Sequence, residues 1–488
     1  MERILTLSGE TFFGHARELR TDRLNLIRRL AAERRDILRM RVFHRHAYFV
    51  NSPRLLHEVL VEKSRSFEKS ALMRYILYPV AGEGLFTSGG ELWRHQRKLM
   101  SPIFQQREIG HFASCMVDCA MRGMAAWQDG EVLDVARETT RITMSIAGRA
   151  LFEADTFDEA DSLGAALTVA LEFANGNAAS PVGLVQTIVR RRLERLSTML
   201  PRRFGSPARD LADSLHGPIL LPTPRVRRLK AAIRLLDDRV QRMIDDRRSA
   251  GLSRRDLLTK LLLARDEDDG SRMSDRQVRD EVLTLFIAGH ETTATALAWA
   301  LYLLAKHPDV LARVTAEVDA LGRPPRFEDL PRLGYSLQVF KEALRLYPPV
   351  YFFSREAAQD VEVSGHLMTQ GTVIFMSPYA MQHRADLWPD PERFDPSRFT
   401  LESEGSRPRM SFFPFGGGPR VCIGNHFALM EGQLVLATLL SRARLELTQG
   451  NTDIEPEPGV TLRPRGGIPM RVRLRGRARD QVHEGRVA

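Results

Sequence analysis

Apolar residues recur at helical spacing along most of the 488 residues, so the hydrophobic pattern predicts a mainly helical protein. Short runs with the pattern of β-strands occur at 38–50, 361–374, 445–447 and 468–474, and another follows Pro349. No internal repeat or linker-like segment divides the chain. We therefore expect a mainly α fold with a small β component (α+β), built as a single domain over residues 1–488.

One apolar stretch, residues 283–305, is nearly long enough to span a bilayer. His290 and Glu291 lie near its middle, where exposure to lipid would be costly. A long helix through the protein core, with its polar groups facing a cavity, explains the stretch better. The sequence also opens without the apolar core of a signal peptide, so no transmembrane anchor is expected.

Composition narrows the environment and the partners. The three cysteines, Cys115, Cys119 and Cys422, are too few for a disulfide framework, which favours a reducing, cytoplasmic location. The formal net charge is +10, but the basic clusters are not interleaved with aromatic residues as in a nucleic-acid groove. We expect no nucleic acid, and an acidic protein partner stays open.

The most informative segment is a glycine-rich loop around one cysteine, Phe415-Gly-Gly-Gly-Pro-Arg-Val-Cys422-Ile-Gly424. A helical pattern follows from Asn425, and the positive end of a helix dipole favours a thiolate. A thiolate held in such a loop is a metal ligand or a nucleophile. The nucleophile would need a histidine base placed by the fold.

Two further pairs carry chemistry or structure. Glu291 and Thr292 place an acid beside an alcohol in the long central helix, which could relay protons or could be a polar pair satisfied within the helix. Glu342 and Arg345 lie one helical turn apart, the spacing of an ordinary solvated salt bridge.

The cysteine loop resembles the haem-binding signature F-x-x-G-x-R-x-C-x-G of the cytochrome P-450 superfamily. All five defined positions match, and they are Phe415, Gly418, Arg420, Cys422 and Gly424. The segment of the central helix that starts at Ala288 is similar to the family's A-G-x-[D/E]-T-[T/S] motif. The Glu342/Arg345 pair is similar to the family's E-x-x-R motif. The resemblance extends from Trp93 to Glu431. It implies the cytochrome P-450 fold, a triangular helical prism with haem between the long helix and the cysteine loop.

The resemblance implies a role for each of these residues. Cys422 would be the axial thiolate of haem b (iron protoporphyrin IX), with Thr292 as the oxygen-side alcohol and Glu291 as the acid. Three arginines would hold the haem carboxylates: Arg97, Arg355 and Arg420. Trp93 shares a helix face with Arg97.

The Glu342/Arg345 network would be completed by a second arginine. Pro391-Glu-Arg393-Phe spells the family's P-x-R-F segment literally, but the fuller pattern starting at Trp388 selects Arg398. We predict Arg398. A few residues would line an apolar substrate pocket by analogy of position: Phe286, Ala288, Val350, Tyr351, Phe352 and those around 72–85.

The implied activity is that of a soluble, bacterial-type haem-thiolate monooxygenase, which inserts one oxygen atom of O2 into an apolar organic substrate by hydroxylation or epoxidation. About sixty residues follow Glu431, too few for a flavin domain, so electrons would come from a ferredoxin or flavodoxin with its reductase. A peroxide-driven haem-thiolate enzyme and a non-catalytic haem-binding gas sensor are the alternatives. Residues 176–225 would form an enlarged lid or entrance, and residues 472–488 a basic tail.

Overall fold

The structure, a computed structural model, describes residues 4–7, 9, 14–43, 45–151, 160–177, 185–186, 189–190, 192–193, 223–249, 251, 256–265, 270–450 and 452–475. Most of the predicted lid region and residues 476–488 of the predicted tail lie outside these residues. Residues 472–474 are not part of a tail, because they complete strand β13 (Pro469–Leu474).

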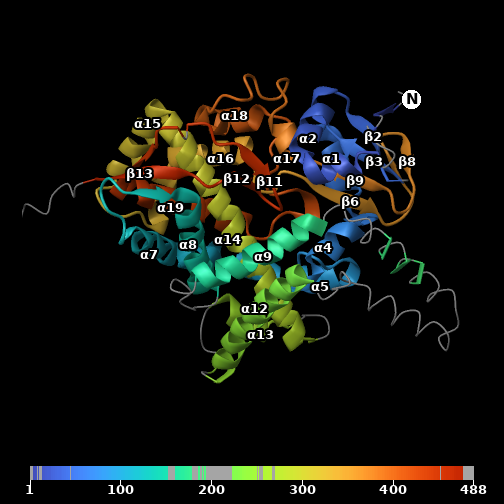
Figure 1. The fold of residues 1–488 in the computed structure, drawn as a ribbon, viewed down its shortest axis with the longest axis horizontal. Helices are drawn as coiled ribbons and strands as arrows, with labels where there is room; N and C mark the ends of the chain where they lie inside the picture. The colour runs from blue at the N-terminus through green and yellow to red at the C-terminus, as the bar shows by residue number, and fades with distance from the viewer. Residues whose placement is uncertain are drawn as a thin grey trace, which may run out of the picture.

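One helix, α14 (Asp275–Lys306), runs through the body of the molecule (Figure 1). It begins at a capping box in which the Ser274 hydroxyl accepts from the Gln277 amide and the Gln277 side chain accepts from the Ser274 amide. It ends before His307-Pro308, where proline starts the next helix. Because α14 is enclosed by other helices, most of its residues are buried, and its apolar pattern covers more than one face.

The helices that pack directly on α14 include α8 (Val135–Ile146), α16 (Gly334–Leu346) and α19 (Asn425–Arg442). Within the described residues, the other α-helices are α1 (Ala16–Thr21), α2 (Arg23–Ala32), α3 (Pro53–His57), α4 (Ala71–Ala81), α5 (Gly90–Met100), α6 (Gln106–Ile109), α7 (Ala113–Met124), α9 (Ala160–Asn177), α12 (Pro224–Ser249), α13 (Leu257–Leu263), α15 (Pro308–Asp319), α17 (Pro378–Gln382) and α18 (Leu401–Ser406).

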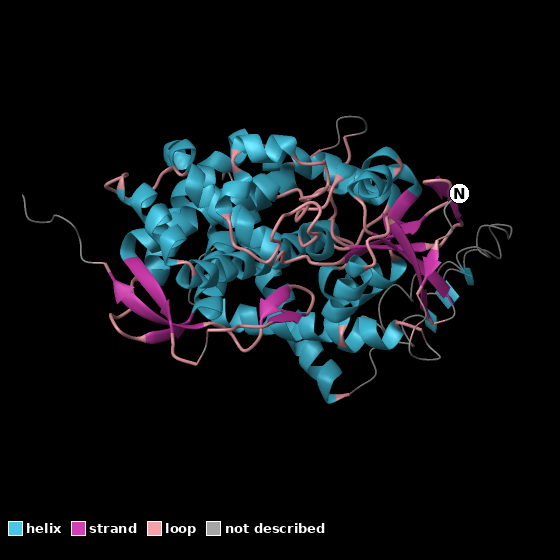
Figure 2. Ribbon diagram, turned by 90° about the horizontal axis from the view of Figure 1, so that it is seen from above, coloured by secondary structure: helices cyan, strands magenta, loops and turns pink. Residues whose placement is uncertain are grey.

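The strands gather at the two ends of the helical body, with one small pair between them (Figure 2). A six-stranded sheet has the order β1-β2-β3-β9-β6-β4, with β1 (Leu5–Thr6), β2 (Ile37–Val42), β3 (Arg45–Val50), β9 (Val373–Met376), β6 (Phe353–Ala357) and β4 (Phe67–Lys69). A three-stranded sheet has the order β10-β13-β5, with β10 (Ala443–Leu447) and β5 (Val132–Asp134). Two hairpins complete the set, β7 (Val361–Val363) with β8 (His366–Met368), and β11 (Pro456–Pro458) with β12 (Leu462–Pro464).

The mainly helical prediction is confirmed, as are strands in each predicted β region. The predicted helix at 283–305 is longer than expected and begins at Asp275. Strands β1, β4, β5, β11 and β12 were missed, and two of them carry residues of the site described below. Of the helices that the structure describes, none is long and apolar enough to cross a membrane.

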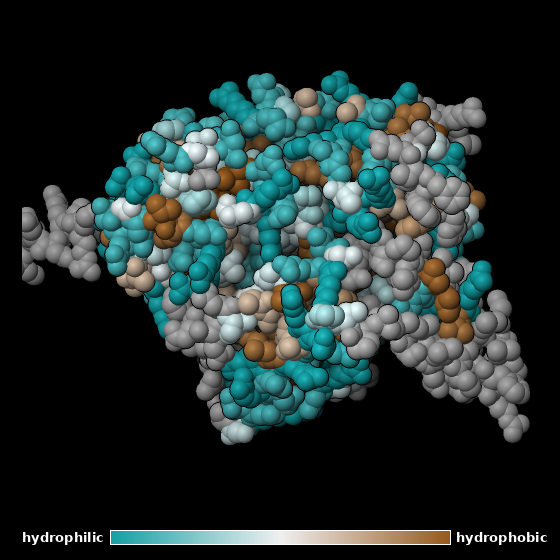
Figure 3. Space-filling model, in the orientation of Figure 1, coloured by the Kyte–Doolittle hydropathy of each residue, from teal (hydrophilic) through white to brown (hydrophobic). Residues whose placement is uncertain are grey.

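The largest hydrophobic core follows α14 and joins it to α7, α8, α12 and α19. Two smaller cores flank the six-stranded sheet, one on each of its faces. The face seen in Figure 3 is mostly hydrophilic, with separate apolar patches. The helical core therefore positions α14 and α19, and the sheet positions the cavity wall opposite them.

Candidate active site

The cysteine loop is fixed by backbone geometry. Gly418 has φ +67°, and a Cβ there would lie 1.8 Å from the Leu60 carbonyl oxygen, so only glycine fits. The Cys422 amide donates to the Phe415 carbonyl at 2.9 Å and closes the loop. Gly424 is the N-cap of α19, so Cys422 lies two residues before the helix cap, close to the predicted position.

The surroundings of Cys422 distinguish a ligand from a nucleophile. Its side chain is exposed, yet protein surrounds it closely enough that burial raises the pKa of the thiol, against the lowering effects of the Gly424 amide and the Arg97 guanidinium. The expected helix-dipole activation is therefore outweighed by burial. No histidine base acts on this thiol among the described residues. A thiolate here needs a strong cation beside it, which favours a metal ligand over a free nucleophile.

Small and polar residues of α14 form another wall. Ala288 is exposed and Thr292 half-buried within a helix whose neighbouring residues are otherwise mostly buried. The Thr292 hydroxyl donates to the Ala288 carbonyl at 2.7 Å, the local bond expected of a threonine in a helix. His290 is buried with Nδ1 2.7 Å from the Phe286 carbonyl, so it is a helix-face residue without access to the cavity.

The Glu291 carboxylate does not bond Thr292. It accepts from the Thr461 hydroxyl at 2.7 Å and pairs with the Arg463 guanidinium at 2.5 Å. Burial raises the pKa of Glu291, but the charge and hydrogen bonds of Arg463 and Thr461 overcome it and bring the pKa below its ordinary value. Glu291 is thus an ionised carboxylate, held by a hairpin 170 residues away in the chain.

Cations line the edge of the site at the six-stranded sheet. Arg355 of β6 lies opposite Lys69 of β4 in register, and Arg420 of the cysteine loop pairs with Glu68. Burial lowers the pKa of Arg355 to about 10, helped by the nearby Arg420 charge. Burial and the Arg420 and Arg355 charges also hold the pKa of Lys69 well below its ordinary value. Arg420 retains one buried Nη1 without a hydrogen-bond partner.

The predicted arginines thus lie in one region of the structure, and Lys69 joins them there. Arg97 acts electrostatically on Cys422, and Trp93 carries the Arg420 guanidinium on its ring, 3.9 Å from the centroid. Lys69 was missed by the sequence reasoning, because nothing around an isolated lysine in a short strand signals an anion site. Glu68 pairs with Arg420 and Glu281 lies near Lys69, but burial raises the pKa of Glu281. Basic side chains therefore outnumber carboxylates here, which suits a ligand with carboxylates.

The structural network lies beneath the cysteine loop. Arg345 Nε and Nη2 donate to Glu342 at 2.7 and 2.8 Å, and both side chains are completely buried. Arg398 Nε lies 3.5 Å from Glu342 Oε1. Arg393 contributes only its backbone carbonyl, which accepts from Arg345 at 3.1 Å.

An apolar cavity of about 290 Å³ adjoins this site. Ala288, Thr292, Val350, Tyr351 and Phe352 line it, as do residues of α4 such as Leu72, Met73, Ile76, Leu77, Val80 and Ala81. Phe286 is not among its described lining residues, since its ring is buried against His290 on the core side of α14.

The residues present fit a haem group. A cysteine sulfur that is exposed although closely surrounded supplies a soft, anionic ligand. Buried cations, one of them with an unpartnered nitrogen, suit the two carboxylates of the porphyrin. Small residues on α14 leave room for a flat cofactor.

Fold and site together define a haem-thiolate oxygenase, and comparison with known proteins gives its family. A family model for cytochrome P450 matches residues 7–469, so the chain belongs to the cytochrome P450 family. Cyclooctatin synthase of Streptomyces melanosporofaciens is 33% identical, with 93% of this chain and 92% of that protein covered. Pentalenene oxygenase of Streptomyces avermitilis is 32% identical, with 96% and 95% covered. The crystal structure of the cytochrome P450DA heme domain has a TM-score of 0.79 at 27% identity and covers 97% of this chain and 99% of that one.

These comparisons confirm the predicted fold, and the class of activity follows from the family. The protein is a haem-iron monooxygenase that uses dioxygen and electrons from redox partners to oxygenate apolar substrates.

Proposed function

We propose that Cys422 is the axial ligand of haem b, and that Arg97, Arg355, Arg420 and Lys69 hold its carboxylates. When bound, the haem supplies the oxygen activation and the insertion into a C–H or C=C bond. The protein's residues hold the cofactor, exclude water and deliver protons. The observation that supports the proposal is the Cys422 sulfur, which lies two residues before the N-cap of α19 and is closely surrounded by protein, with the Arg97 guanidinium acting on it.

The test of the ligand is spectroscopic. The reduced carbon-monoxide complex should show the red-shifted Soret band of thiolate ligation, and Cys422→Ser should lose it. Cys119→Ser is the matched control, because Cys119 is buried in α7 outside the site and should leave the band in place. A band that survives in Cys422→Ser would refute the assignment.

The substrate is proposed to be an apolar, unsaturated hydrocarbon or a mono-alcohol derived from one. The lining of the cavity is mostly aliphatic and aromatic, which suits such a molecule. Relatives carry the names pentalenene oxygenase and cyclooctat-9-en-7-ol 5-monooxygenase, the latter 34% identical over 88% of this chain. Titration with a library of cyclic alkenes, their alcohols, fatty acids and steroids should give a Soret shift with the first two classes. Selective shifts with fatty acids would contradict the proposal.

Thr292 and Glu291 are proposed to deliver protons on the cavity side. Thr292→Ala should release several-fold more peroxide per electron consumed, while Thr292→Ser, which keeps the hydroxyl, should stay near the wild type. The peroxide-driven alternative predicts strong turnover with peroxide and none with reduced partners. The gas-sensor alternative predicts no product and no effect of Thr292→Ala.

Electrons are proposed to come from an acidic ferredoxin or flavodoxin with its reductase, in a cytoplasmic setting. Arg94 and Lys98 are exposed on α5, on the same helix as Arg97, and could steer such a partner. Arg420 does not contribute to this outer face, because its side chain is turned inward over Trp93 and paired with Glu68. Partner affinity should fall with ionic strength, and Lys98→Glu should weaken it; affinity independent of salt would contradict the proposal.

A further inference from the structure

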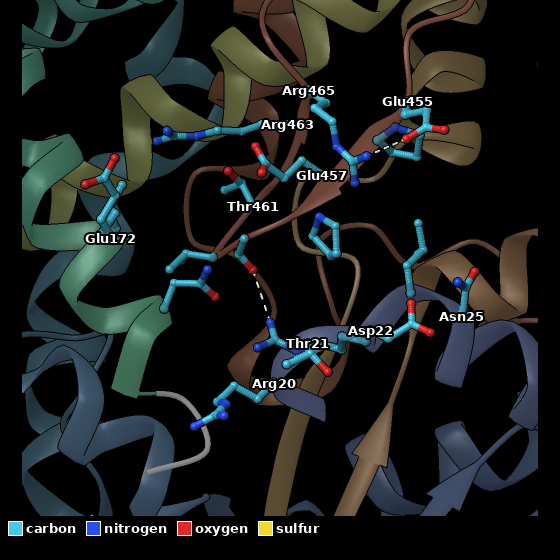
Figure 4. Close-up of a pocket in the computed structure, with 18 of the residues that line it drawn as sticks. Arg20, Thr21, Asp22, Asn25, Glu172, Glu455, Glu457, Thr461, Arg463 and Arg465 are labelled. Carbon is cyan, nitrogen blue, oxygen red and sulfur yellow. Dashed lines mark hydrogen bonds and ion pairs between the residues drawn. The ribbon is translucent and has the colours of Figure 1, made fainter. Parts of the chain in front are cut away.

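One arginine lies where the apolar cavity meets a second, polar space. That space, here called the hairpin groove, has about 730 Å³ and lies between α2, α9 and the β11–β12 hairpin (Figure 4). Six described residues line both spaces, and one of them is charged; they are Arg23, Leu171, Asn175, Gly459, Val460 and Thr461. Arg23, the first residue of α2, therefore lies at the boundary between an apolar and a polar environment.

Three hydrogen bonds hold the Arg23 guanidinium in place. Its Nη1 donates to the Tyr351 hydroxyl at 2.8 Å and to the Gly459 carbonyl at 3.2 Å, and its Nε donates to the Leu19 carbonyl at 2.8 Å. The Tyr351 hydroxyl in turn donates to the Gly459 carbonyl at 3.0 Å. Tyr351 is almost completely buried, and burial raises the pKa of its hydroxyl, which therefore keeps its proton. A tyrosine and the turn of the hairpin thus fix the guanidinium.

The third nitrogen of this guanidinium is not engaged. Within the part of the chain that the structure describes, Arg23 Nη2 makes no hydrogen bond, although it carries two N–H donors. Arg23 is half-buried, so these donors differ from those of an arginine on the open surface. An oxygen of a bound molecule at the boundary would satisfy one of them. The same oxygen in the aliphatic part of the cavity would be buried without a partner, at a cost in binding free energy.

Two other hydroxyl sites on the cavity wall compete poorly with Arg23 for a ligand oxygen. Ser70 and Ser354 both line the cavity, but their hydroxyls bond each other at 2.8 Å. The Thr284 hydroxyl has no partner, but it faces Gly84, where an added Cβ would lie 2.1 Å from the Thr284 oxygen. Arg23 combines free donors with a position that a ligand in the cavity can reach.

The charges of the hairpin groove favour a neutral oxygen over a carboxylate. Five arginines and four carboxylates line the groove, and two of the arginines are already paired, Arg463 with Glu291 and Arg465 with Glu455. The other three arginines are balanced by three carboxylates, which Figure 4 shows around the groove: Asp22, Glu172 and Glu457. Arginine also binds a carboxylate best through two nitrogens, whereas Arg23 has one left.

We propose that Arg23 is a specificity-determining residue whose Nη2 donates a hydrogen bond to a hydroxyl oxygen of the substrate, and that Tyr351 positions Arg23 for this contact. The substrate is then a cyclic mono-alcohol, with its hydroxyl at the boundary and its hydrocarbon body in the apolar cavity. This inference rests on the proposed function, in which the substrate is an alkene or a mono-alcohol derived from one, and it selects the mono-alcohol. Because the hydroxyl fixes one end of the molecule, the same part of the hydrocarbon faces Thr292 in each turnover.

Helix α2 offers a matched control in Arg28. Its Nε and Nη2 also donate to a tyrosine hydroxyl, that of Tyr379, at 3.2 and 2.9 Å. Arg28 lines the hairpin groove but is not among the described residues that line the cavity. Arg28→Met thus removes the same charge and the same kind of hydrogen bond from the same helix, without touching a ligand in the cavity.

The experiment compares two ligands with the same carbon skeleton, cedrol and α-cedrene, by Soret titration of the haem-loaded enzyme. The wild type should bind the alcohol cedrol about tenfold more tightly than the hydrocarbon, the effect of one hydrogen bond to a charged group. Arg23→Met should bring the ratio of the two dissociation constants close to one, and Tyr351→Phe should lower it part of the way. Arg28→Met should keep the wild-type ratio. Because each ratio is taken within one variant, a loss of stability or of haem does not mimic the effect.

A second measurement follows the products. With NADPH, a surrogate ferredoxin and its reductase, the wild type should oxygenate cedrol mainly at one carbon. Arg23→Met should spread the oxygenation over several carbons, whereas Arg28→Met should keep the wild-type product pattern.

Three outcomes would overturn the inference. The first is equal affinity of the wild type for cedrol and α-cedrene. The second is an equal loss of affinity for both ligands in Arg23→Met, which would make Arg23 a structural brace between α2 and the hairpin. The third is tighter binding of palmitic acid than of cedrol, lost in Arg23→Met, which would identify a carboxylate as the ligand. The first two leave the Soret test of Cys422 and the apolar substrate class untouched, so a failure here is distinguishable from a failure of the proposed function.

Discussion

Arg345 holds Glu342 through two hydrogen bonds of 2.7 and 2.8 Å, with both side chains at 0% exposure. The remaining donors of Arg345 reach three backbone carbonyls, those of Gln382, Pro391 and Arg393. One guanidinium therefore ties α16 to α17 and to the chain that leads toward the cysteine loop. An isolated surface pair of the same spacing would contribute almost nothing.

Replacing either member of this pair should be severely destabilising. Arg345→Met leaves the Glu342 carboxylate buried without its partner, which costs about 3–5 kcal/mol. We expect a large loss of folded holoenzyme, measured as haem content per chain and as the midpoint of chemical unfolding. Arg465→Met is a suitable control, because Arg465 and its partner Glu455 are both more than half exposed. Equal losses in the two variants would contradict the assigned role.

The choice between Arg398 and Arg393 gives a second prediction. Arg398→Ala removes a cation 3.5 Å from Glu342 and two donors to the Pro389 and Asp390 carbonyls, so it should cost about 1–3 kcal/mol. Arg393→Ala keeps the backbone carbonyl that Arg345 uses and should change stability by less than about 0.5 kcal/mol. Urea unfolding of the two variants measures the difference. A larger loss in Arg393→Ala would show that the literal P-x-R-F segment completes the network.

The cysteine loop predicts a contrast between two glycines. Gly418→Ala would place a methyl group 1.8 Å from the Leu60 carbonyl oxygen and should prevent stable haem incorporation. Gly416 has a similar φ of +74°, but a Cβ there meets nothing within 4 Å. Gly416→Ala should therefore cost only backbone strain, about 1–2 kcal/mol. Haem content and the carbon-monoxide spectrum of both variants provide the measurement, and a comparable loss in both would rule out the close contact as the cause.

Glu281 predicts a pH dependence of stability. Burial raises the pKa of this carboxyl to about 8, although the Leu85 amide donates to it at 2.8 Å and Lys69 lies nearby. Because the pKa is higher in the folded protein than in the unfolded chain, the folded state binds the extra proton. Its contribution to stability is full below about pH 4.3 and is lost as the pH rises toward 8.

The check is the free energy of unfolding of the wild type and Glu281→Gln between pH 5 and 9. Glutamine stays neutral, so the difference between the two proteins should move in favour of the variant as the pH rises, and level off above 8. Parallel curves across this range would show that Glu281 is ionised in the folded protein.

The sequence by itself determined the features that are contiguous in the chain. The cysteine loop, the acid and alcohol of α14 and the Glu342/Arg345 pair all depend on spacing within one loop or one helical turn, which local geometry fixes. The long buried helix followed from its apolar pattern around His290 and Glu291. Even the choice of Arg398 over Arg393 rested on a local pattern. In the structure Arg398 Nε lies 3.5 Å from Glu342 Oε1, and the two alanine variants test the choice.

The tertiary structure decided which distant segments meet. Lys69 joins Arg355 only because β4 pairs with β6, and the two residues are far apart in the chain. The β11–β12 hairpin was hidden by Pro456, Pro458 and Pro464, which suggest loop rather than strand, so nothing in the sequence placed Thr461 and Arg463 beside Glu291. Phe286 was assigned to the pocket by position along α14, but a helix turns about 100° per residue, and its packing against the core turned Phe286 away from the cavity. Contacts between segments that are distant in the sequence depend on how the whole chain folds. The spacing of residues within one segment does not predict them.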